Sequence, residues 1–246
     1  FRSSDNTLTW NAATTPGLQT LAPGKAGSVD FSIRTKSAFP IKRLSDKNFI
    51  LKVSATIESP TVPHFVGSGK TVSYAVLESK VGGLVDLDAR AYFRDAASGI
   101  LNSGPLPMKV NQPTQFTIHW IITNYSTDIK DVKIKSFLGG NVRMGGIIKS
   151  NGSMIPTYND RTQEVVWEIP KVPATTGLVA KPLEAIFQVE VTPYAIDLGK
   201  DMLLIQDSQL TAIDEFTMLE LADKDSGITT QLPDDPTVGG QGTVTQ

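Results

Sequence analysis

The amino-acid sequence predicts an all-β protein made of antiparallel sheets. Apolar and polar residues alternate in short runs along the chain, which is the period of a strand with one buried face. Clusters of Gly, Pro, Asn and Asp separate these runs, as turns separate the strands of a sandwich or barrel. Helical spacing of apolar residues occurs only in residues 214–225, where we expect no more than one helical turn.

The alternating runs follow one another from residue 29 to residue 191. The expected strands are 29–33, 53–59, 71–76, 84–93, 115–124, 132–138, 165–169 and 187–191. Large apolar side chains at inward positions of such strands form the core of a sandwich. The core residues that this pattern predicts are Trp10, Phe31, Trp120, Trp167, Phe187 and Val189. Asn124 ends a strand, and we expect its side chain to hold the following turn by bonding nearby backbone.

One stretch, Gly-Ser-Gly-Lys-Thr at 67–71, is similar to the end of a phosphate-binding loop. Such a loop needs a glycine five residues before Gly69, and that position is His64. The loop must also open a helix, whereas residues 72–76 alternate as a strand does. The pattern therefore favours a turn that leads into a strand, with Lys70 in solvent.

Composition narrows the classes of function. The chain has 246 residues, of which 40% are hydrophobic and 20% charged, enough for one large or two modest domains. Its net charge of −2 does not support a nucleic-acid partner, which normally requires a basic surface. No apolar run is long enough to span a membrane. The absence of cysteine excludes disulfides, thiol catalysis and cysteine-bound metal.

The titratable residues offer little material for catalysis, and we expect no catalytic, cofactor or metal site. His119 lies opposite the apolar positions of its strand, which predicts an exposed side chain rather than a catalytic base. Calcium remains an alternative at four pairs of acidic residues, Asp86 with Asp88, Asp197 with Asp201, Asp214 with Glu215, and Asp234 with Asp235. A Lys–Asn isopeptide crosslink requires a buried lysine, whereas Lys133 and Lys135 alternate outward.

The chain also repeats itself. Residues 5–35 are similar to residues 162–192, with Trp10 at the position of Trp167. Two further matches follow at nearly the same offset, 53–59 with 210–215 and 71–76 with 228–232. Repetition of this length indicates tandem modules.

The two copies are not equally complete. The second copy has strands at 84–93, 115–124 and 132–138 before its Trp167 strand, and the first copy has no equivalent. Either the natural protein continues before residue 1, or another chain supplies these strands, or the first module closes on its neighbour's residues. The sequence therefore divides into a partial sandwich module at 1–82, a complete module at 83–233 and a flexible tail at 234–246. A sharper alternative for the tail is that Gly-Thr-Val-Thr-Gln pairs with a neighbouring subunit as an added strand.

Particular motifs resemble a known family. Residues 116–144 contain an alternating strand that ends in Thr-Asn, a polar turn, a second strand and a loop that leads to a valine. In residues 158–177 and 6–33 a tryptophan strand leads into a turn, and in 6–33 a strand such as Val-Asp-Phe-Ser-Ile follows. These segments resemble the front and back halves of bacterial Ig-like conserved surface repeats, in particular those of candidate-phyla bacteria. The second copy departs from the pattern, because a longer segment at 172–185 replaces the short turn.

The resemblance implies two tandem Ig-like antiparallel β-sandwich modules, the first without its N-terminal half. It also implies a non-catalytic, extracellular structural subunit of a cell-surface fibre, stalk or surface layer. We expect its partners to be further copies or neighbouring repeats. The alternatives are an adhesin-type module that binds a host-cell protein or a glycan through its loops, and an accessory domain of a larger surface enzyme.

Overall fold

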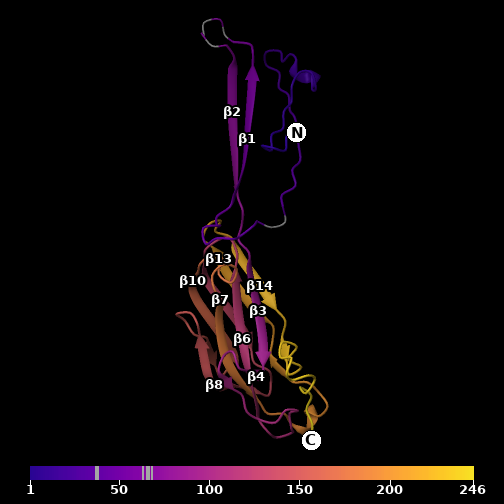
Figure 1. The fold of residues 1–246 in the computed structure, drawn as a ribbon, viewed down its shortest axis with the longest axis vertical. Coiled ribbons are helices and arrows are strands. Elements are labelled where there is room, and N and C mark those ends of the chain that lie inside the picture. The colour runs from indigo at the N-terminus through magenta and orange to yellow at the C-terminus, as the bar shows by residue number, and fades with distance from the viewer. Residues whose placement is uncertain (37–38, 63, 65–66, 68) are drawn as a thin grey trace. The chain divides into compact units, whose positions relative to one another are not determined.

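A computed structural model describes residues 1–36, 39–62, 64, 67 and 69–246 (Figure 1). Across these residues the regular elements are β-strands and two short 3-10 helices, so the predicted all-β class is confirmed. The described chain falls into two compact units, Phe1–Phe39 and Pro40–Gln246.

The first unit, Phe1–Phe39, contains no β-strand among its described residues. It has one 3-10 helix, η1 (Pro16–Leu18), and the ring of Trp10 lies 5.8 Å from the ring of Phe31. The predicted strand at 29–33 is absent, and Phe31 is 49% exposed, so its assignment to a core is wrong. Trp10 is half-buried and also lies outside the core. An alternating sequence forms a strand only when a neighbouring strand satisfies its backbone groups, and residues 1–36 and 39 contain no such neighbour.

The second unit begins with a two-stranded hairpin. Strands β1 (Ile50–Ser59) and β2 (Thr71–Lys80) pair antiparallel in unbroken register along all ten residues. β2 starts at the threonine of the Gly-Ser-Gly-Lys-Thr stretch, so the expected strand after that stretch is confirmed. Ser68 lies outside the described residues.

The remainder of the second unit is a sandwich of two antiparallel sheets. The first sheet has the strand order β14 (Glu220–Asp225), β13 (Ser208–Asp214), β7 (Ile129–Phe137), β10 (Glu164–Val172) and β9 (Thr157–Asn159). The second sheet has the order β3 (Val85–Tyr92), β6 (Thr114–Asn124), β11 (Leu183–Val191) and β8 (Val142–Ser150). The strands predicted at 84–93, 115–124 and 132–138 are β3, β6 and β7.

Short elements complete the unit. They are β4 (Arg94–Asp95), β5 (Ile100–Leu101), η2 (Ala195–Asp197), β12 (Leu203–Ile205) and β15 (Ile228–Thr229). β4 pairs with β5, and β12 pairs with β15. None of the helices among the described residues is long and apolar enough to cross a bilayer.

The core lies between the two sheets and contains the large side chains of alternate positions. Trp120, Trp167, Phe187 and Val189 are all completely buried. The rings of Trp120 and Phe187 meet edge to face at 5.0 Å, and the indole N–H of Trp120 donates to the Ser208 hydroxyl at 3.0 Å. The indole N–H of Trp167 donates to the Met154 carbonyl at 2.9 Å, so both buried tryptophans have a hydrogen-bond partner for their polar group.

The turn after β6 is held as the sequence predicts. The Asn124 side-chain amide donates to the backbone carbonyls of Thr127, Val172 and Pro173, at 2.8, 3.2 and 2.9 Å. One buried side chain therefore links the β6–β7 turn to the end of β10.

The C-terminal residues 234–246 are not a free tail. Val238 and Val244 are buried, and Asp235 is 3% exposed. The backbone N–H of Val244 donates to Lys200, and that of Thr245 donates to Met108. The expected flexibility is wrong because two valines and one carboxylate find partners on the sandwich, and composition alone does not reveal those partners.

Candidate functional site

The hairpin β1–β2 has two chemically different faces. In an antiparallel pair, residues directly opposite each other point to the same side of the sheet. One side carries no charged residue at all, and we call it the charge-free face. It consists of Leu51, Val53, Ala55, Ile57 and Ser59 on β1 and of Thr71, Ser73, Ala75, Leu77 and Ser79 on β2. Such a pattern is typical of a sheet face that packs on a core.

The charge-free face is largely exposed within its own unit. Ile57 is 64% exposed, Leu77 is 65% exposed, and Leu51 is 37% exposed. Single exposed apolar residues are ordinary, but several on one continuous face mark a surface that a partner covers.

The opposite face of the hairpin carries all of the charged residues of the two strands, together with the apolar residues Ile50, Val72 and Val76, which are 49%, 47% and 49% exposed. Lys52 pairs with Glu78 at 2.9 Å and Lys70 with Glu58 at 2.7 Å, all four side chains being more than half exposed. Tyr74 on the same face is 81% exposed. The two faces therefore differ in charge, although both expose apolar side chains.

Both outer edges of the hairpin are open. β1 pairs with β2 and with no other strand in the described structure, and Figure 1 shows these two strands as a separate ribbon pair. In each strand about half of the backbone N–H and C=O groups point to the outer edge. An open edge of this length is a template for another strand, and an isolated two-stranded hairpin is only marginally stable in water.

The base of the hairpin is attached to loops of the sandwich. The Lys47 ammonium lies 3.1 Å from the Asp128 carboxylate, and Lys80 donates to the Phe216 carbonyl at 2.7 Å. Burial raises the pKa of Asp128, but the Ala174 N–H and the Lys47 ammonium outweigh it, so the pKa lies below its usual value. The negative charge at Asp128 is therefore maintained where the hairpin is anchored.

The sandwich closes one of its own edges with carboxylates, in contrast to the hairpin. Asp223 accepts the backbone N–H of Leu87 and Asp225 that of Ala89, each at 2.7 Å. Both acceptors project from β14 in one sheet onto the edge strand β3 of the other. These bonds occupy donors of β3 that could otherwise recruit a foreign strand.

Two further carboxylates extend this closure. Asp214 accepts the N–H of Gly83 at 2.8 Å, just before β3, and Asp235 accepts those of Phe93 and Arg94 at 3.0 and 2.9 Å, just after it. Burial raises the pKa of each of these two aspartates, but the backbone N–H donors outweigh this effect and leave each pKa below its usual value. Both groups are therefore charged acceptors at neutral pH.

His119 is buried, and the expectation that it is exposed is wrong. The residue is 5% exposed. Its ring forms hydrogen bonds with the Asp95 carboxylate through Nε2 and with the Glu184 carboxylate through Nδ1, each at 2.7 Å. The Tyr92 ring packs edge-on at 5.0 Å. The β4–β5 segment, which carries Asp95, covers this outer face of the sheet, and strand alternation alone cannot predict that cover. The cluster fastens β4–β5 to β6 and β11.

Several of the acidic residues considered for calcium bond to other groups of the protein. Within the described residues, no group of three or more acidic or histidine side chains is arranged to hold a metal ion. Asp88 pairs with Arg90, Asp201 accepts bonds from Gln231 and Thr243, and Asp214 and Asp235 accept backbone N–H groups. Burial raises the pKa of Asp86, and the nearby carboxylates of Asp223 and Asp88 raise it further.

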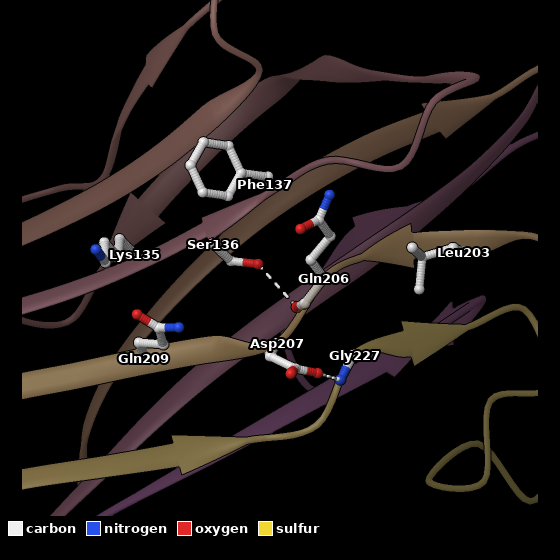
Figure 2. A pocket seen from close by; sticks show the side chains of 8 residues that line it. All are labelled: Lys135, Ser136, Phe137, Leu203, Gln206, Asp207, Gln209 and Gly227. Atoms are coloured by element: carbon white, nitrogen blue, oxygen red, sulfur yellow. Dashed lines mark hydrogen bonds between the residues drawn. The ribbon is translucent and has the colours of Figure 1, made fainter.

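The two lysines considered for an isopeptide crosslink are not in the core. Lys133 is 47% exposed and pairs with Glu168 at 3.0 Å. Lys135 is half-buried at the surface of β7, beside the hollow shown in Figure 2.

A shallow hollow of about 390 Å³ lies at the junction of β7, β12 and β13 (Figure 2). Two hydrogen bonds shape its floor, from the Ser136 hydroxyl to the Gln206 carbonyl and from the Gly227 N–H to Asp207, both at 2.8 Å. Its lining is Lys135, Ser136, Phe137, Leu203, Gln206, Asp207, Gln209 and Gly227.

Sequence reasoning missed the carboxylate closure and the charge-free face. A signal for the face was present, because β1 and β2 carry charges only at positions of one parity. The Asp223 and Asp225 acceptors gave no signal, since their partners are more than 130 residues away in the chain.

Comparison with known proteins finds solved structures that are similar to part of this chain at low sequence identity. No protein family profile and no curated protein sequence matches the chain. Among solved structures, BcpA, the major pilin subunit of Bacillus cereus, is 10% identical with a TM-score of 0.39 over 75% of this chain and 65% of that one. The major pilin SpaD of Corynebacterium diphtheriae is 10% identical with a TM-score of 0.35, over 67% and 50%. The C-terminal domain of the antigen I/II-family protein AspA of Streptococcus pyogenes is 12% identical with a TM-score of 0.29, over 64% and 50%. The chain spans less than two thirds of the length of each.

Proposed function

We propose that this chain is a non-catalytic structural subunit of a bacterial cell-surface fibre, stalk or surface layer, and that it assembles through its open β-edges. The observation that carries the proposal is the β1–β2 hairpin, whose charge-free face and both edges are open within its unit. The motif resemblance to Ig-like surface repeats supports an extracellular location.

The physical argument rests on the contrast between two edges of one chain. The β3 edge is occupied by Asp223 and Asp225, whereas the β1 and β2 edges carry no such acceptor among the described residues. Proteins that stay monomeric protect exposed edges, and an edge that is left open beside an apolar face favours association. Complete burial of each large apolar side chain on that face contributes about 1.5–3 kcal/mol.

The test is the solution mass of the chain and of two matched variants. Leu77→Glu places a charge on the charge-free face, and Tyr74→Glu places one on the opposite face of the same strand. Light scattering after size exclusion across a range of concentrations is expected to show oligomers for the parent chain and for Tyr74→Glu, and a monomer for Leu77→Glu. A parent chain that stays monomeric at every concentration contradicts the proposal.

A second candidate function is glycan binding at the hollow of Figure 2. Its lining combines the Phe137 ring, 37% exposed, with the side-chain amides of Gln206 and Gln209, groups able to stack on and hydrogen-bond a sugar. Glycan-array binding that is lost in Phe137→Ala, with the oligomeric mass unchanged, favours this alternative.

A further inference from the structure

Residues 27–36 form a segment with the sequence of a strand and no strand partner. The sequence, Gly-Ser-Val-Asp-Phe-Ser-Ile-Arg-Thr-Lys, alternates apolar and polar side chains, yet the segment has no regular secondary structure. All of its residues are exposed, and Val29, Phe31 and Ile33 are 40%, 49% and 65% exposed. Within the described part of the chain, its backbone groups take part in no hydrogen bond and its charged side chains in no ion pair. A segment of this kind is suited to joining the edge of a sheet.

The outer edge of β1 lacks a strand in the same way. β1 is ten residues long, as is the segment 27–36. It pairs with β2 on one side, and its N–H and C=O groups on the other side meet no strand of the described chain. Each copy of the protein therefore carries one unpaired segment and one unpaired edge of equal length.

The charges of the two stretches match in spacing and are opposite in sign. The segment carries Asp30 and Lys36, and β1 carries Lys52 and Glu58 on the side opposite the charge-free face, each pair being six residues apart. When the two stretches run parallel, Asp30 lies beside Lys52 and Lys36 lies beside Glu58. When they run antiparallel with these positions aligned, both pairs join like charges, which is destabilising. The charges therefore favour the parallel direction.

The same alignment brings the apolar positions together. It places Val29, Phe31 and Ile33 beside Leu51, Val53 and Ala55 on the charge-free face. Aromatic and β-branched side chains that are neighbours across two strands stabilise a sheet. The strand β2 does not offer an equivalent match, because its two charged residues, Glu78 and Lys80, are only two positions apart.

We propose that residues 27–36 of one copy add as a parallel strand to the outer edge of β1 in a second copy. This inference rests on the proposed function and names the segment that the open edge receives. Backbone hydrogen bonds supply the pairing, and the alternating side chains set the register. The strand that the sequence predicts at 29–33 then forms in the assembly, where a neighbour satisfies its backbone groups. A contact between two different surfaces is head to tail, and such contacts repeat along a filament unless they close into a ring.

A crosslink between two chains tests the register. Ser32 and Ser54 lie beside each other in the proposed pairing, and the chain has no cysteine. A chain with Ser32→Cys is mixed with a chain with Ser54→Cys and oxidised, and a disulfide-linked dimer that joins these two positions is expected in mass spectrometry. The matched control replaces Ser32→Cys by Ser28→Cys, which lies roughly 13 Å farther along the same strand and is expected to give no such dimer.

An inversion of charge tests the direction. Asp30→Lys combined with Lys36→Glu leaves the net charge of the chain unchanged and places like charges beside Lys52 and Glu58. It is expected to raise the concentration needed for half-assembly by about tenfold, as measured by light scattering. The control, Asp5→Lys with Lys25→Glu, makes the same exchange outside the segment and is expected to leave that concentration unchanged.

The outcomes separate this inference from the proposed function. A parent chain that assembles, but gives no crosslinked dimer and is unaffected by the inversion, overturns the inference and leaves self-assembly in place. A parent chain that stays monomeric and gives no crosslink overturns both. An intramolecular disulfide in a chain that carries both cysteine substitutions, without a dimer in the mixture, assigns the segment to its own chain and also overturns the inference.

Discussion

Removal of one carboxylate, Asp225→Ala, tests whether the closure of the β3 edge stabilises the sandwich. Asp225 is half-buried and accepts the backbone N–H of Ala89 at 2.7 Å, and Ala89 is 7% exposed. A hydrogen bond to a charged acceptor contributes about 1.5–3 kcal/mol, and partial exposure of the carboxylate places the expected loss near 1.5 kcal/mol. For a domain of this size that loss lowers the Tm by roughly 3–6 °C.

The assay is urea unfolding followed by near-ultraviolet circular dichroism of the buried Trp120 and Trp167. The matched control is Glu220→Ala, which removes an exposed carboxylate from the same strand, one with no hydrogen bond or ion pair among the described residues. Asp225→Asn retains an acceptor oxygen without the charge and is expected to fall between the two. If Asp225→Ala and Glu220→Ala unfold within about 0.5 kcal/mol of each other, the carboxylate does not stabilise the edge and the reasoning is refuted.

Three further changes have expected outcomes. The folded-state pKa of Asp214 lies below its unfolded value of about 3.9, so the ionised carboxylate stabilises the folded protein fully above that pH, and this contribution is lost as the pH falls through the folded pKa. Asp214→Asn should therefore reduce the loss of unfolding free energy at acid pH. An unchanged pH dependence of the unfolding free energy would contradict this prediction. Trp120→Ala should cost about 3–5 kcal/mol in urea unfolding, whereas Trp10→Ala should leave the sandwich transition in place, and equal losses would refute the difference in burial. His119→Leu leaves the Asp95 carboxylate buried without its ring partner and should lower the free energy of unfolding by about 3–5 kcal/mol. Adding Asp95→Asn to this variant should restore part of the loss. A His119→Leu variant as stable as the parent would show that the cluster does not hold β4–β5 against the sheet.

Much of the second unit follows from local sequence. Alternation located β3, β6, β7, β10 and β11, because each has partners on both sides or a core beneath it and the period of two is enforced there. The role of Asn124 was also predictable, since an amide at a strand end bonds the backbone a few residues away.

The candidate assembly surface was predictable only in part. The predicted repeat, with its unequal copies, implied a shortage of strand partners; independently of that prediction, the hairpin β1–β2 has open outer edges among the described residues. The closure of β3 by Asp223 and Asp225 was not predictable, because it joins residues distant in sequence, and the burial of His119 depends on β4–β5 covering an outer face.

By itself, the sequence determined the all-β class, the strand period and the inward side of the sandwich strands β6, β10 and β11, since these depend on residues two apart in one strand. Tertiary structure alone decided which of those strands exist. The predicted repeat matches Trp10 with Trp167, yet only Trp167 lies in a core. A strand is stabilised by its neighbours rather than by its own residues, because its backbone groups bond outward to other strands. The presence of neighbours is a property of the assembled sheet.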